Sequence, residues 1–245
     1  MRKSQIIVLS ALGAVALLIV GAIVSARLVA GRLASGEYSE ESPRARRSSP
    51  VASISRDLSG FDRVDARGRW KIDIERGDAW DVVLTYSESA EDRIDVRVEN
   101  RRLVLEEERR GWSWFGRGGD ETFEAAITMP TLEAIDLAGA SELTLSGFNG
   151  EELAITVAGQ TKIKGDGRYD ELQLVVNGMG EVNLDDVVVN DANVVLSGMG
   201  EVTLNMNGGV LAGTVSGMGQ LQYRGTVREE NVVTSGFSSV KALEQ

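Results

Sequence analysis

The amino-acid sequence predicts an all-β protein, a parallel β-helix-like solenoid preceded by an N-terminal hydrophobic helix. Three observations predict it. A glycine motif recurs at a nearly constant interval, apolar and polar residues alternate on both sides of each glycine, and one long apolar stretch lies near the N-terminus. Repeats with a period of about 20 residues are typical of solenoids, and alternation with a period of two is typical of strands with one buried face.

The N-terminal stretch is long enough to cross a membrane. Arg2 and Lys3 precede an uncharged, mostly apolar segment that runs from Ile6 to Ala26. A helix that crosses the bilayer core needs about 20 residues, whereas the apolar core of a signal peptide has about 7 to 15. The length favours a retained signal anchor within residues 1–30, which makes the membrane a partner. The small residues at 24–26 leave a cleaved signal peptide as the alternative.

Composition separates the next segment from the body of the chain. Residues 31–54 hold two of the three prolines and show no apolar period, so we expect a flexible linker. Residues 1–50 hold seven Lys and Arg against three Asp and Glu, and the remainder holds 19 against 34. An acidic body repels phosphates, which argues against a nucleic-acid partner. We expect an inner-membrane anchor with the body in the periplasm, or a secreted or surface protein if the segment is cleaved.

The regular repeat covers about residues 131–245. The first glycines of its nearly evenly spaced motifs are Gly139, Gly159, Gly178, Gly198, Gly217 and Gly236. Three copies continue as Gly-Met-Gly, with second glycines at Gly180, Gly200 and Gly219. Most units place apolar residues two and four positions before the first glycine, and four and six positions after it. We therefore expect each unit to be a strand, a tight turn and a strand, with units stacked about 4.8 Å apart around one core.

Stacking also predicts what shares a column. All equivalent turns must have one backbone conformation, and glycine allows the positive φ or close backbone approach that a sharp corner requires. The first two motifs read Gly-Ala-Ser and Gly-Gln-Thr, so looser turns are expected there. Glu181 and Glu201 are expected to stack, with Lys162 offsetting part of their repulsion and a bound calcium ion as the alternative. Three methionines are expected to fill corners, in preference to binding a soft metal: Met179, Met199 and Met218.

Residues 56–130 lack the regular glycine spacing, but they still alternate as strands do. The alternating stretches are 61–66, 70–78, 80–86 and 94–107. Asn100 and Arg101 fit a hairpin turn inside the last of them. Residues 109–121 then interrupt the strands with Trp112, Trp114 and Phe115 among three arginines and four glycines. Aromatic side chains beside arginine can stack on sugar rings or on a partner surface. These three are the predicted ligand-binding residues, and a loop folded back on the sheet edge is the alternative.

The chain contains no cysteine and no histidine, which excludes disulfides, thiolate or imidazole metal sites and Ser-His-Asp catalysis. We expect no cofactor, no metal ion and no catalytic residue, and hence a binding protein that is not an enzyme. One alternative is an envelope scaffold that forms homo-oligomers through unpaired strand edges. A less favoured one is polysaccharide cleavage by carboxylates alone, although a catalytic acid needs a pocket that raises its pKa. Its candidates are Glu181, Asp185, Asp186 and Glu201.

The order of motifs over about residues 55–241 is itself distinctive. "FDRVDARGRWKIDIERGD" is followed by "ITMPTLEAIDLAGASELTL", by repeated "SGMGEV", and by "YRG" and "SGFSSVK". In these features the chain resembles the bacterial DUF2807 family of auto-transporter adhesin, head GIN domains. The resemblance implies a pectin-lyase-like superhelix of two sheets over 55–245, with the glycine motifs at the turn between them. It also implies a cell-envelope location and an adhesion role. We expect the partner to be an envelope protein or a polysaccharide.

Overall fold

In the computed structural model, residues 51–107 and 123–244 are described, and almost all of them lie in β-strands. The described part holds one 3₁₀ helix, Glu88–Arg93, and no α-helix. The predicted all-β class is therefore confirmed. The expected N-terminal helix at 1–30 and the linker up to residue 50 lie outside the described residues.

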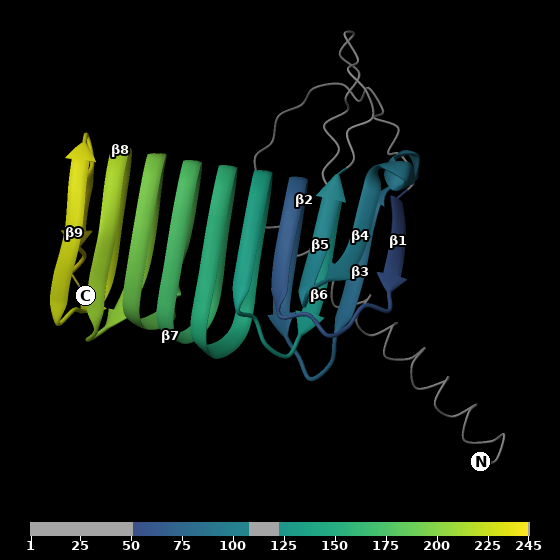
Figure 1. Ribbon diagram of the computed structural model, residues 1–245, viewed down its shortest axis with the longest axis horizontal. Helices are drawn as coiled ribbons and strands as arrows, with labels where there is room; N and C mark the ends of the chain where they lie inside the picture. The colour runs from purple at the N-terminus through teal and green to yellow at the C-terminus, as the bar shows by residue number, and fades with distance from the viewer. Residues whose placement is uncertain (1–50, 108–122, 245) are drawn as a thin grey trace, which may run out of the picture. The chain divides into compact units, whose positions relative to one another are not determined.

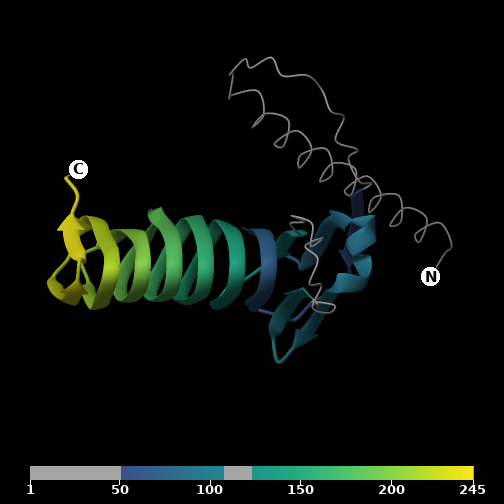
Figure 2. The ribbon, with the colours of Figure 1, turned by 90° about the horizontal axis from the view of Figure 1, so that it is seen from above.

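The strands differ greatly in length. In chain order they are β1 Val51–Arg56, β2 Arg63–Arg76, β3 Asp81–Ser87, β4 Ile94–Glu99, β5 Arg102–Glu107, β6 Phe123–Met129, β7 Ala134–Asn207, β8 Val210–Thr226, β9 Glu229–Gly236 and β10 Ser239–Ala242. Figures 1 and 2 show that β7 is one continuous ribbon whose successive segments lie side by side between β2 and β8. We call the segment around each first glycine, which is one repeat of the motif, a rung.

The rungs pair in parallel, with glycine opposite glycine. In the ladders between strands, Gly68 pairs with Gly139, Gly198 with Gly217, and Gly217 with Gly236. Within β7, a Cβ added at each first glycine would come within 3.0 Å of the carbonyl oxygen of the glycine one rung earlier. All six first glycines have a positive φ, between 80° and 139°. A side chain at these positions would clash with the backbone of the neighbouring rung, and its residue would need a φ that L-residues rarely adopt. Glycine avoids both the clash and the strain.

The two halves of each rung enclose one hydrophobic core. The side chains two and four positions before the glycine are mostly buried, as are those four and six positions after it, from β2 through β8. In the rung of Gly198 these are Val194, Leu196, Val202 and Leu204, all 0% exposed. On the outer face, polar side chains bond from rung to rung, as in the 3.2 Å contact between the hydroxyls of Ser197 and Ser216.

A seventh glycine belongs to the column, and the sequence reading missed it. Gly68 has a φ of 118°, and Val64 and Ala66 before it and Ile72 and Ile74 after it occupy the buried positions of the repeat. Residues 61–66 and 70–78 were expected to be two strands, yet β2 continues through Gly68 because the backbone bends there without leaving the ladder. The period was hidden because residues 77–133 separate this rung from the next.

Short strands cover the outer side of β2. Strands β5 and β6 each pair in parallel with one half of β2, while β3, β4 and β1 add antiparallel pairs beyond them. The predicted hairpin turn joins β4 to β5, and Asn100 and Arg101 both have positive φ, as the favoured two-residue turn requires. Strand β1 takes up the end of the expected linker, 51–54, because Ala52 and Ile54 pack on the core beside β3.

Candidate functional site

In the rungs of Gly139 and Gly159, the first and third residues after the glycine are exposed and the second is buried. In the rung of Gly159, Lys162 is exposed and Gln160 is also open to solvent, whereas Thr161 is buried. This alternation follows from the period of two in a strand. Equivalent side chains therefore form three columns along the rungs, two facing outward and one facing inward.

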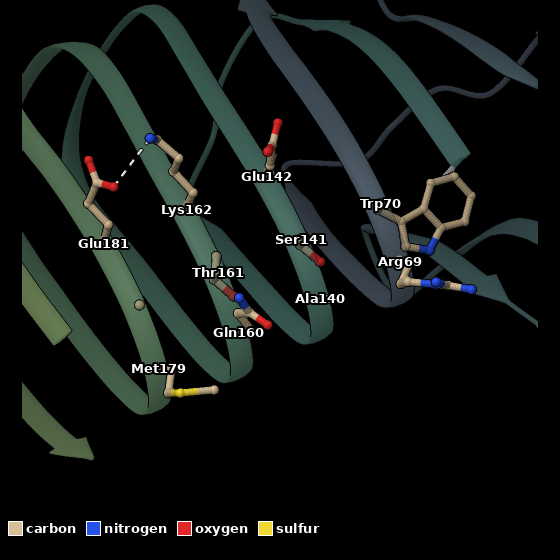
Figure 3. A pocket seen from close by; sticks show the side chains of 11 residues that line it. Arg69, Trp70, Ala140, Ser141, Glu142, Gln160, Thr161, Lys162, Met179 and Glu181 are labelled. Carbon is tan, nitrogen blue, oxygen red and sulfur yellow. Dashed lines mark ion pairs between the residues drawn. The ribbon is translucent and has the colours of Figure 1, made fainter. Parts of the chain in front are cut away.

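These columns line a hollow of about 500 Å³ that crosses the first four rungs of the parallel ladder (Figure 3). Its residues follow Gly68, Gly139, Gly159 and Gly178. They are Arg69, Trp70, Ala140, Ser141, Glu142, Gln160, Thr161, Lys162, Met179, Gly180 and Glu181. The hollow arises because the inward column becomes small after Trp70, falling to serine, threonine and then glycine.

Charge in the hollow is balanced, in contrast to the net −11 of the chain. Arg69 and Lys162 supply two cations, and Glu142 and Glu181 supply two carboxylates. Lys162 Nζ lies 3.2 Å from Glu181 Oε2, the contact drawn in Figure 3. That contact agrees with the expectation that Lys162 offsets the repulsion between stacked glutamates. One rung further on, Glu201 accepts a 2.6 Å hydrogen bond from Gln222.

Ser141 supplies an unsatisfied group beneath the hollow. Its side chain is 6% exposed, and its Oγ has no hydrogen-bond partner among the described residues.

Gly139 and Gly159, in the two rungs that were expected to have looser turns, have φ values of 122° and 134°. These rungs keep the glycine geometry of the others, with a small polar side chain buried where a second glycine stands in later rungs. Gly180, Gly200 and Gly219 do not have positive φ.

The methionine column points outward instead of filling corners, so that expectation is wrong. Met179, Met199 and Met218 are 47%, 44% and 57% exposed, because each is the first residue after its glycine. Met179 lies at the edge of the hollow in Figure 3. The thioethers form an apolar row that leads away from the hollow along the rungs.

The predicted ligand-binding residues Trp112, Trp114 and Phe115 lie outside the described residues. The residues that flank this stretch do contact the hollow's first rung. The backbone N–H of Arg69 donates a 3.3 Å hydrogen bond to the Glu107 carboxylate, and the Trp70 and Phe123 rings pack with centroids 5.2 Å apart.

The structure brings few of the candidate catalytic carboxylates together. Glu181 pairs with Lys162, and Asp185 and Asp186 stand on the far half of the same rung, four and five positions further along. Within residues 51–107 and 123–244, no group of three or more Asp and Glu side chains is placed to hold a metal ion. None of the helical segments in that part of the chain is long and apolar enough to span a bilayer.

The sequence reading singled out Lys162, Met179 and Glu181 but missed most residues of the hollow. Arg69 and Trp70 were missed because their rung was not recognised. Ala140 and Gln160 entered only as parts of the Gly-Ala-Ser and Gly-Gln-Thr motifs, and Glu142 was not singled out. The available signal was position: each is the first or third residue after a column glycine.

A solved structure with a TM-score above 0.5 shows the same fold at low sequence identity. A "putative adhesin" from Bacteroides fragilis has a TM-score of 0.58 and 16% identity, and the match covers 80% of this chain and 98% of that one. A "putative lipid binding protein" from Parabacteroides distasonis has a TM-score of 0.40 and 13% identity, covering 79% and 97%. No curated protein sequence matches the chain.

The family model described as "Putative auto-transporter adhesin, head GIN domain" matches residues 60–226. The match begins before β2 and ends at the end of β8, and it includes every residue of the hollow. It therefore spans the ladder from its first glycine, Gly68, to its second-last, Gly217. The chain belongs to the DUF2807 family.

Proposed function

We propose that the chain is a non-enzymatic β-solenoid of the bacterial cell envelope that binds a surface partner, as an adhesin does. The observation that carries the proposal is the hollow, which presents fixed donors, acceptors and apolar groups on an in-register ladder. A rigid backbone need not be ordered on binding, which favours recognition. The family description, an auto-transporter adhesin, supports a surface or envelope location.

The cellular location of the body depends on whether the N-terminal segment is retained or cleaved. If residues 1–30 are retained, they anchor the chain in the inner membrane and the body lies in the periplasm. If they are cleaved, the body is secreted or displayed on the surface. Cell fractionation combined with N-terminal sequencing of the mature protein distinguishes the two.

The aromatic residues Trp112, Trp114 and Phe115 remain a predicted second contact for the partner. Their flanking residues Glu107 and Phe123 support this, because both contact the rung of Arg69 and Trp70. The triple alanine variant should weaken binding of envelope fragments and leave the unfolding midpoint unchanged. An unchanged affinity would favour the alternative, a loop folded on the sheet edge.

The test of the binding function uses the full-length chain in a detergent without a sugar headgroup. Immobilised protein is incubated with solubilised envelope protein and with envelope polysaccharide from the same bacterium. Retention of either component, together with weaker adhesion of cells that lack the gene, is the expected result. No retained component and unchanged adhesion would contradict the proposal.

A scaffold that self-assembles is the second candidate, and the C-terminal rung favours it. Strands β9 and β10 pair with β8 on one side only within the described residues, and Val233 and Phe237 on this rung are 66% and 91% exposed. An unpaired parallel edge with exposed apolar side chains invites another strand. Sedimentation of the full-length chain over a wide range of concentration tests this, since a strict monomer would exclude it.

A further inference from the structure

We infer that the hollow across the rungs of Gly68, Gly139, Gly159 and Gly178 binds a short, uncharged or zwitterionic saccharide. This rests on the proposed binding function and names the ligand class of its site. It is argued from the residues of the hollow alone.

The polar groups of the hollow match hydroxyl groups. Lys162 can only donate hydrogen bonds, Glu142 and Glu181 can only accept them, and the Gln160 amide does both. Neighbouring rungs thus offer groups of opposite hydrogen-bonding type within a short distance. A hydroxyl is both donor and acceptor, so a polyol satisfies such a surface, whereas a purely anionic or cationic ligand meets a like charge.

The balance of charge separates a saccharide from other polar ligands. The two carboxylates cancel the two cations, so the hollow has no net positive charge to attract phosphorylated or uronic-acid ligands, and the acidic chain as a whole repels them. A bound cation is not favoured either, because the described carboxylates form no metal-ligating group. A neutral or zwitterionic molecule avoids both electrostatic costs.

Apolar groups beside the polar ones suit the C–H faces of sugar rings. The Ala140 methyl and the Met179 thioether both stand at the first position after their glycines, with Gln160 between them. In Figure 3 Met179 lies at the lower edge of the hollow, and Lys162 and Glu142 lie on its other side. A sugar ring placed over these residues would contact the apolar groups on one side and hydrogen-bond to the charged groups on the other.

The repeat distance of the rungs matches a chain ligand. Strands in a ladder lie about 4.8 Å apart, so the four rungs span on the order of 14 Å, a length that accommodates a short oligosaccharide. Below them, the Ser141 hydroxyl has no partner among the described residues. With the buried Thr161, it gives the hollow a small polar floor.

The experiment measures binding of the full-length chain, in a detergent without a sugar headgroup, to a printed array. The array carries neutral, N-acetylated amino-sugar and uronic-acid oligosaccharides of matched length. Affinity for the best neutral or amino-sugar probe is then measured by calorimetry for the native chain and four variants. We expect neutral or amino-sugar probes to bind and uronic-acid probes to bind at least about tenfold more weakly, a difference of about 1.4 kcal/mol.

Two variants alter the hollow, and two controls alter outward columns outside it, Met199 at the first position after its glycine and Gln220 at the third. Ala140→Met fills the hollow with a side chain that the ladder already accepts at the equivalent Met179 and Met199, and Gln160→Ala removes a two-way hydrogen-bonding group. We expect affinity to fall about tenfold for the first and about fivefold for the second. The controls Met199→Ala and Gln220→Ala should change affinity less than twofold. All four should keep the native unfolding midpoint within the error of measurement.

Each outcome decides between the two proposals. Saccharide binding that Ala140→Met and Gln160→Ala leave intact overturns the site while the binding function stands. No saccharide binding, with envelope protein still retained by the immobilised chain, overturns the ligand class in favour of a protein partner. Preference for uronic-acid probes also overturns the ligand class. Retention of neither polysaccharide nor protein overturns both proposals.

Discussion

The two ends of the parallel ladder are built from the same repeat but are finished differently. At the β2 end, β5 and β6 pair with β2, and antiparallel strands extend the sheet beyond them. Trp70 and Phe123 are each 1% exposed there. At the β9 and β10 end, Val232 and Val240 are only half-buried, although they occupy repeat positions that are fully buried in most rungs before.

The difference shows that the burial of a repeat position depends on the rungs beside it and not only on which residue occupies it. A rung buries its apolar side chains only when another rung or a covering strand lies on each side, as expected for units that interact with nearest neighbours. The last described rung has a neighbour on one side only. A substitution in the last rung should therefore reduce the stability of the protein less than the same substitution in an interior rung. The last rung should also unfold first.

The column glycines should give the largest effect. Gly178→Ala places a methyl group against the Gly159 carbonyl in a backbone with a φ of 139°, so we expect a loss of about 3 kcal/mol. Gly236→Ala has a φ of 80° and its neighbours on one side only, so we expect about 1 kcal/mol. Denaturant unfolding of both variants, followed by circular dichroism, measures the two losses of stability. Equal losses would mean that the two ends of the ladder do not differ.

The same core substitution can be compared at one repeat position. Val194 is 0% exposed and Val232 is half-buried, and both stand four positions before their glycines. Val194→Ala should cost about 2–3 kcal/mol through lost contacts and a cavity, and Val232→Ala less than about 1 kcal/mol. Urea unfolding of the two variants measures this. A cost at Val232 as large as at Val194 would mean that the last rung is covered by something else in the native protein.

Alkaline pH should loosen the last rung in a defined window. The Tyr223 hydroxyl donates a 2.6 Å hydrogen bond to the Glu230 carboxylate in β9, and this bond, followed by burial, raises the pKa of Tyr223 to about 12. Because the folded pKa lies above the unfolded value of about 10, the stabilisation is fully present below about pH 10. It is lost as the pH rises from about 10 through about 12.

Tyrosine absorbance and unfolding midpoints between about pH 9 and 12.5 measure this loss. Tyr223→Phe should make the decline in stability shallower. Tyr169, whose pKa is raised by burial between interior rungs, should still ionise late in that variant. An unchanged decline in Tyr223→Phe would show that the bond to Glu230 does not hold the last rung.

The smallest effect should come from the ion pair of the hollow. The Lys162 and Glu181 side chains are 47% and 55% exposed, and such pairs contribute about 0–1 kcal/mol because water and salt screen them. Lys162→Ala should therefore change stability by less than about 1 kcal/mol, and the change should vanish in high salt. A loss several times larger would mean that the corner columns support the ladder itself.

Much of this architecture could be predicted from the sequence because the repeat acts locally. The spacing of glycines and the alternation around each one suffice to place Gly139 through Gly236, since every rung obeys the same rule. Gly68 obeys it too, but the whole of 69–138 separates it from Gly139, so a search for a fixed period passes it by. Long-range pairing between β2 and β7 carries no local signal.

The hollow could not be predicted, for a related reason. It depends on Trp70 being followed, one rung later, by Ser141 and then by Thr161, and these residues become neighbours only once the register of β2 is known. The methionine column was placed correctly, but its side chains were assigned to the wrong face. The residue after the glycine points outward, and only the backbone path at the corner decides that.

The central claim, that equivalent corners stack in one column, can be tested directly because the chain has no cysteine. Met199 and Met218 are register partners, about 4.8 Å apart at Cα, within the range of about 4.4–6.8 Å that a disulfide spans. The double variant M199C/M218C should form an intramolecular disulfide under mild oxidation. The double variant M179C/M218C, two rungs apart, should not. Bond formation in the second variant but not in the first would contradict the stacked column.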